Sequence, residues 1–160
     1  MGVAPIDLFG SCLRLLPGGE IRTRADAGAG DGWRLTAVYA RTGADVDSGR
    51  WQAHPESEKL VSCLVGMIRL HLRPERPGER EEEIRLTAGT AVVVPRGRWH
   101  RIEPDIPSNV LIVAPARGTL SAPATQAGAG TTGRSGGGSG WWTQVRSHDQ
   151  IATSIGHSSA

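Results

Sequence analysis

The chain has 160 residues, of which 38% are hydrophobic, so its length and composition fit one domain with a single core. The formal net charge is only +2, with basic and acidic residues interspersed, which argues against nucleic-acid and membrane partners. Cys12 and Cys63 are too few for a disulfide framework, and neither a membrane span nor a signal peptide is evident, so we expect a soluble cytoplasmic protein.

Residues 1–32 contain two apolar patches, IDLF and LRLL, which precede a glycine-rich segment. Each patch has the length of a short strand, and the glycines that follow are typical of a loop. We therefore predict that one or two N-terminal strands pair with the main domain.

Residues 33–117 break into short β-rich runs separated by turn residues, which predicts about eight strands. In the run MIRLHL, Ile68, Leu70 and Leu72 alternate with polar residues, which is the period of a strand with one wet face. Gly66 joins two apolar runs and predicts a bend between strands. Because closure protects unpaired strand edges, we expect an all-β jelly-roll barrel that encloses one small ligand. The runs are WRLTAVYA, RWQAH, KLVSCLV, MIRLHL, EIRL, TAVVV, WHRIE and NVLIVA.

Two further segments are rich in charged or small residues. Residues 73–83 concentrate charge with two prolines and a glycine, which indicates an exposed connection. Residues 118–160 are rich in Gly, Ser, Thr and Ala, a composition that buries too little apolar surface to offset the entropy of ordering. We predict a disordered tail there, in which the pair Trp141 and Trp142 is more typical of unstructured sequence than of a docking element.

The segment GTAVVVPRGRWH carries the strongest local signal in the chain. Gly89 opens a turn, residues 92–94 form a buried strand, and Pro95 and Gly97 make a tight turn. His100 then begins the returning strand. This pattern aims the His100 side chain inward at a defined place.

The same segment resembles the second motif of the cupin family, with its two glycines, proline and histidine all at matching positions. Pro104 replaces the asparagine that often closes that motif, a position that is not expected to bind metal. The first cupin motif is partly present in QAHPESEKLVSCLVG. There His54 matches the second histidine, Gln52 stands in place of the first, and Gly66 matches the closing glycine. The resemblance covers residues 33–117 and implies a small one-domain cupin with its pocket around the two histidines.

The position of the first motif's glutamate is ambiguous. Counting forward from His54 places Glu58 there, whereas counting back from the closing glycine places Lys59 there. If Glu58 points inward, the resemblance implies that His54, Glu58 and His100 hold a divalent transition metal such as iron, manganese, nickel or zinc. Gln52 would then be a weak fourth ligand. If Lys59 points inward, its ammonium group would repel such an ion and attract an anionic group of a ligand.

Two functions follow from these alternatives. The first function is the binding of a small molecule inside the barrel near Gln52, His54, Lys59 and His100, with a degenerate metal site. The alternative is a metal-dependent oxygenase, isomerase or lyase. A sensor domain that reaches a partner through its tail ranks behind both, because the tail has no recognition motif. The resemblance also implies a homodimer. The interpretation of the histidines as hydrogen-bonded barrel residues without chemistry stays open.

Several other polar and aromatic residues are predicted to lie outside the site. His71 falls on the polar face of its strand, and the two histidines of the tail are far from either motif. Glu103 falls on the face opposite to His100 by strand parity. Trp51 and Trp99 flank the two histidines and would suit an aromatic wall for an apolar ligand, but core packing is the role that we favour for both.

Overall fold

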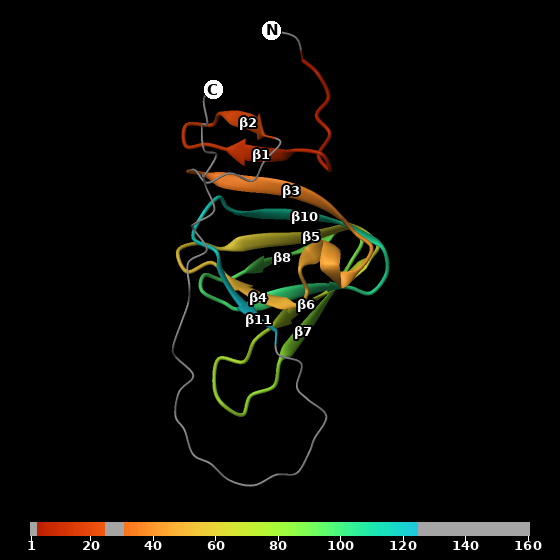
Figure 1. The fold of residues 1–160 in the computed structure, drawn as a ribbon, viewed down its shortest axis with the longest axis vertical. Helices are drawn as coiled ribbons and strands as arrows, with labels where there is room; N and C mark the ends of the chain where they lie inside the picture. Colours follow the sequence, from red (N-terminus) through yellow and green to blue (C-terminus); the bar gives the residue numbers. More distant parts are fainter. Residues whose placement is uncertain (1–2, 25–30, 125–160) are drawn as a thin grey trace, which may run out of the picture.

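The structure, a computed structural model, describes residues 3–24 and 31–124. These residues form eleven strands and one short 3-10 helix, and the strands build two antiparallel sheets (Figure 1). The predicted all-β class is therefore confirmed. Within the described ranges, no helix has the length and apolarity that crossing a membrane requires. The pair Trp141 and Trp142 lies outside the described residues.

The first sheet has six antiparallel strands. They are β1 (Cys12–Leu15), β2 (Ile21–Arg24), β3 (Trp33–Ala40), β5 (Lys59–Val65), β8 (Thr90–Val94) and β10 (Ser108–Pro115). Their order across the sheet is β2-β1-β3-β10-β5-β8. Strand β10 pairs with β3 on one side and with β5 on the other, so segments far apart in the sequence lie side by side at the centre of the sheet.

The second sheet has five antiparallel strands. They are β4 (Arg50–Ala53), β6 (Met67–Leu72), β7 (Glu82–Thr87), β9 (His100–Pro104) and β11 (Leu120–Pro123). Their order is β11-β4-β9-β6-β7, and the 3-10 helix η1 (Gly43–Val46) lies between β3 and β4 in the chain. Figure 1 shows the two sheets as separate layers, with the β1–β2 hairpin at the far edge of the first.

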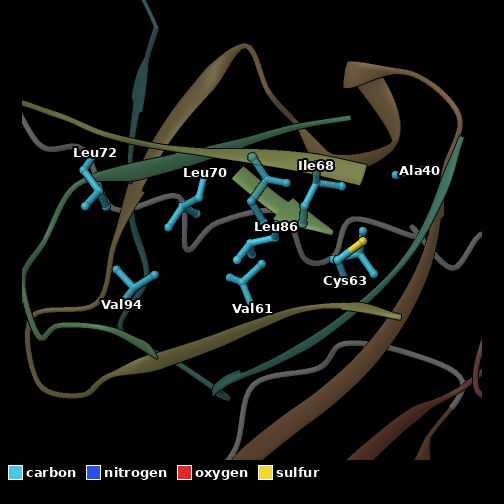
Figure 2. Close-up of a cluster of buried hydrophobic side chains, with 10 residues drawn as sticks. Ala40, Val61, Cys63, Ile68, Leu70, Leu72, Leu86 and Val94 are labelled. Carbon is cyan, nitrogen blue, oxygen red and sulfur yellow. The ribbon is translucent and has the colours of Figure 1, made fainter. Parts of the chain in front are cut away.

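The core lies between the two sheets and is built from alternate residues of their strands (Figure 2). In β6, Ile68 and Leu70 are fully buried, as the alternation of MIRLHL predicts. Each large aliphatic side chain buried in this way stabilises the fold by about 1.5–3 kcal/mol. The buried cluster comprises Ala40, Val61, Cys63, Ile68, Leu70, Leu72, Leu86, Val94, Ile102 and Val110.

The bend predicted at Gly66 is present between β5 and β6. Gly66 has a φ of +96°, and a Cβ atom there would lie 2.3 Å from the Ser108 hydroxyl oxygen. That hydroxyl accepts a hydrogen bond from the Met67 N–H at 2.9 Å and donates one to the Ile106 carbonyl at 2.7 Å. Only glycine therefore fits this corner, where the chain passes from the first sheet to the second.

Strands at the two ends of the domain depart in part from the sequence prediction. An N-terminal hairpin does extend the sheet, but of the two apolar patches only LRLL contributes a strand, and IDLF forms a turn. Strand β11 lies within the segment predicted as a disordered tail, so the prediction that disorder begins at residue 118 is wrong. It pairs with β4 from Leu120 opposite Ala53 to Pro123 opposite Arg50. The edge of β4 supplies the hydrogen-bond partners that the composition of this segment does not reveal.

Candidate functional site

The turn between β8 and β9 brings the two sequence motifs together. Gly97 adopts a φ of +72°, and its N–H donates a hydrogen bond of 2.8 Å to the backbone carbonyl of His54. At the start of β9, His100 lies directly opposite Gln52 of β4. The glycine of one motif thus fixes the histidine of the other, and Gln52, His54 and His100 gather at one place.

The two imidazole rings form a buried pair. Their centroids are 5.9 Å apart, and His54 and His100 are 4% and 1% exposed. Nδ1 of His100 lies 3.0 Å from the carbonyl oxygen of Arg98, which can only accept, so Nδ1 carries the proton and Nε2 keeps a lone pair. Nδ1 of His54 lies 3.3 Å from the Thr119 hydroxyl. Among the described residues, neither Nε2 atom has a hydrogen-bond partner.

The ambiguity between Glu58 and Lys59 is resolved by the start of β5. Lys59 is the first residue of this strand and is only 4% exposed, whereas Glu58 is exposed in the preceding turn. The Lys59 ammonium donates a hydrogen bond of 3.0 Å to Oε1 of Gln52. The register that places the lysine inward is therefore the one that the chain adopts.

A cavity of about 530 Å³ lies beside these residues. Its lining contains two basic residues and no acidic residue. His54 lines the cavity, whereas His100 does not, although the centroids of the two rings are only 5.9 Å apart. The lining residues are Phe9, Gly10, Ser11, Cys12, Arg34, Thr36, Gln52, His54, Lys59, Ile112, Ala114 and Thr119.

Burial and the basic residues together set the protonation states of the site. Burial, followed by the charges of Lys59 and Arg34, lowers the pKa of His54 to about 4. Burial also lowers the pKa of His100 to about 3, with Lys59 as the second cause. The pKa of Lys59 falls to about 8, first through burial and then through Arg34. At neutral pH both imidazoles are therefore neutral, while most of the Lys59 amines still carry a proton.

The side chains at this site do not fit a divalent metal ion. The predicted set of His54, Glu58 and His100 is not assembled, since Glu58 is exposed outside the cavity. In the part of the chain that the structure describes, no group of three His, Cys, Asp or Glu side chains could hold a metal. The oxygen of Gln52 already accepts a hydrogen bond from Lys59, and the ammonium group that donates it would repel a cation.

The sequence motifs do not indicate the rest of the cavity wall, which comprises the segment Phe9 to Cys12, Arg34, Thr36, Ile112, Ala114 and Thr119. Arg34 and Thr36 share one face of β3 because they are two residues apart. The other face of the run WRLTAVYA also carries apolar residues, so its alternation did not reveal which face is inside. Thr119 falls in the segment whose composition predicts a tail, and the apolar patch that contains Phe9 predicts a strand rather than a cavity wall.

Trp51, Trp99, His71 and Glu103 do not line the cavity, as predicted, although Trp99 is only half-buried rather than part of the core. The two histidines of the tail lie outside the described residues. Trp51 is 8% exposed and packs under the Arg101 guanidinium, whose carbon lies 5.3 Å from the ring centroid. His71 lies away from the cavity, with Nδ1 at 2.7 Å from Glu81 and Nε2 at 3.1 Å from Glu103. The parity argument that separated Glu103 from His100 is thereby confirmed.

Taken together, the fold and the site define a two-sheet β-protein with a basic, ligand-sized cavity beside a buried histidine pair. No family model matches the chain, and no curated protein matches its sequence.

Solved structures similar to this chain include a cupin-2 domain containing protein from Shewanella frigidimarina, at 20% identity and a TM-score of 0.37. The match covers 52% of this chain and 69% of that one. The cupin domain of Drosophila melanogaster CENP-C matches at 16% identity and a TM-score of 0.34, over 52% of this chain and 54% of that one. Hydroquinone 1,2-dioxygenase from Sphingomonas matches at 15% identity and a TM-score of 0.39, over 56% and 62%. Cupin-fold proteins are thus among the structures that the chain resembles.

Proposed function

We propose that this protein binds a small anionic molecule, such as a carboxylate, in the cavity beside His54 and Lys59, without a metal ion. The single observation that carries the proposal is the charge of the cavity wall. Arg34 and Lys59 are basic, and none of the lining residues is acidic. A buried ammonium group that lacks a carboxylate partner is costly, and an anionic ligand would offset that cost.

The polar groups around Lys59 suit a ligand that both accepts and donates hydrogen bonds. The Lys59 ammonium has three donors, one of which is directed at Gln52. The hydroxyls of Thr36 and Thr119 add groups that both donate and accept, while Ile112 contributes apolar surface to the wall. A volume of about 530 Å³ falls within the range of small-molecule sites. The expected ligand is therefore a compact carboxylate with an apolar part.

Calorimetric titration with matched pairs of compounds tests this proposal. Benzoate and benzamide have nearly the same shape and differ in charge. At an effective dielectric constant of 20, a charge pair about 4 Å apart gains about 4 kcal/mol before desolvation, so we expect benzoate to bind about tenfold more tightly or better. Lys59→Met should abolish this preference, whereas Arg85→Met, which removes an exposed cation outside the cavity, should preserve it.

Three results would contradict the proposal. Equal affinity for the acid and the amide would show that the cavity does not select charge. Unchanged benzoate binding by Lys59→Met would show that the ammonium group is not the recognition element. One transition metal held per purified chain, and lost from His54→Ala, would favour a metal-dependent enzyme instead.

A further inference from the structure

The chain contains a single lysine, and that lysine lines the cavity. Of its 18 Lys and Arg residues, 17 are arginine and only Lys59 is lysine. Lys59 is also almost fully buried, at 4% exposure. A requirement for positive charge alone would be met by arginine, which this chain uses everywhere else. The position therefore points to a property that an amine has and a guanidinium lacks, namely the ability to act as a nucleophile.

The surroundings of Lys59 favour the reactive, neutral form of this amine. Among the described residues, no carboxylate lies within ion-pair distance of Nζ, and its hydrogen-bond partner is the neutral Gln52 amide. Burial and the nearby charge of Arg34 bring the pKa of Lys59 down to about 8. A substantial fraction of the amine is therefore unprotonated slightly above neutral pH, as in enzymes whose lysine attacks a carbonyl group.

We propose that Lys59 forms an imine with the carbonyl carbon of a small 2-oxo acid held in this cavity, an inference that rests on the proposed anion-binding function. The Nζ lone pair attacks the carbonyl carbon, and the carbon–oxygen π bond breaks to give a carbinolamine. The nitrogen then forms a double bond to carbon as the hydroxyl leaves as water. The two hydrogens of that water come from the amine, so the step consumes no oxidant or reductant.

Residues beside Lys59 supply the remaining requirements of this step. The imidazole of His54 is neutral and lines the same cavity, as does the Thr119 hydroxyl 3.3 Å from its Nδ1, so these two groups are assigned the transfer of protons from nitrogen to oxygen. Arg34 lies on the same wall, where a guanidinium attracts the carboxylate next to the reacting carbonyl. This second charge is the reason for assigning a 2-oxo acid rather than a simple aldehyde.

Reductive trapping tests the proposal directly. The full chain is incubated with pyruvate or phenylpyruvate and sodium cyanoborohydride, and the adduct is located by intact-mass and peptide analysis. The only competing amine is the α-amine of the chain, whose ordinary pKa of about 8 matches that of Lys59. If basicity alone decided the rate, both amines would be labelled equally fast. We expect the cavity to make labelling of Lys59 about tenfold faster or more.

Two variants and two matched compounds separate the imine from simple binding. Lys59→Arg keeps the charge but has no nucleophilic amine, so it should lose trapping while still binding lactate and phenyllactate, the non-reactive analogues, in calorimetric titrations. Arg34→Gln should lower trapping by pyruvate more than trapping by acetone, which has no carboxylate; both should fall to some extent, because removing the Arg34 charge raises the pKa of Lys59. Trapping by the unchanged protein should increase as the pH rises through 8.

The possible outcomes are distinguishable. If lactate or phenyllactate binds but Lys59 is labelled no faster than the α-amine, the imine is refuted and the anion-binding function stands. If neither analogue binds and no adduct forms, both proposals fail. If acetone labels Lys59 as fast as pyruvate does, the assignment to 2-oxo acids is wrong.

Discussion

Replacing the buried lysine with methionine is expected to stabilise the protein at neutral pH. Methionine keeps the apolar length of the side chain and removes the charge that burial disfavours. The pKa of Lys59 falls from 10.5 to about 8 on folding, and each unit corresponds to about 1.4 kcal/mol, so the buried charge costs about 3 kcal/mol at pH 7. Loss of the hydrogen bond to Gln52 offsets about 1 kcal/mol of the gain. The net expectation for Lys59→Met is therefore an increase of about 2 kcal/mol in the free energy of unfolding.

The sign of this effect has a characteristic dependence on pH. Below pH 8 the amine is protonated in both the folded and the unfolded protein, so the full cost is present. Between about pH 8 and 10.5 the folded protein releases this proton while the unfolded chain keeps it, so the stability of the unchanged protein rises. The advantage of Lys59→Met should therefore shrink over this window. Other groups that titrate in the same range are common to both proteins and cancel in the difference.

Urea unfolding at pH 7, 9 and 10.5 measures this difference. The Arg85→Met variant, which removes an exposed cation, should lie within about 0.5 kcal/mol of the unchanged protein at each pH. A lower stability of Lys59→Met at pH 7 would refute the reasoning. A difference in the free energy of unfolding that stays constant up to pH 10.5 would also refute it, because it would show that burial does not lower the pKa of the Lys59 amine.

Three further predictions concern the histidines, one corner and the core. The free energy of unfolding should fall as the pH drops below about 6.5, because His54 and His100 stay neutral in the folded protein while the unfolded chain takes up protons. Urea unfolding at pH 7 and 5 should show a loss of about 2 kcal/mol for each imidazole, and the total loss should be smaller for His100→Gln. Gly66→Ala should lower the melting temperature more than Gly78→Ala, since both have positive φ but only the first meets neighbouring atoms; equal effects would argue against the steric explanation. Leu70→Ala should cost about 2–5 kcal/mol in chemical unfolding, and a cost below 1 kcal/mol would contradict its place in the core.

The parts of the fold that could be predicted are those with local signals. Alternation in β6, the turn around Gly97 and the bend at Gly66 are all specified by a few adjacent residues. Strands β2 and β11 were harder, because each is a short polar edge segment whose pairing depends on a partner strand. No property of four residues such as LSAP indicates that the exposed edge of β4 lies beside them.

The candidate site likewise has parts that the sequence predicts and parts that it does not. The turn at Gly97 and the strand after it placed His100 inward, and the first motif located His54 beside it. Sequence spacing could not choose between Glu58 and Lys59, because neighbours in a strand point to opposite faces and a shift of one residue exchanges them. The pairing of β10 with β5 contains a register shift between Asn109 and Val110, which cannot be detected by counting residues along the sequence. Only the pairing of β5 with its neighbours determines which side chain enters the cavity.

The cavity wall joins residues near both ends of the described chain, from Phe9 to Thr119. A fragment cut to the strand-rich stretch between residues 33 and 117 would keep His54 and Lys59 but lose two sides of the chamber. It would also lose the hydroxyl beside Nδ1 of His54. The part of the chain that builds the cavity wall is therefore longer than the part that carries the two motifs.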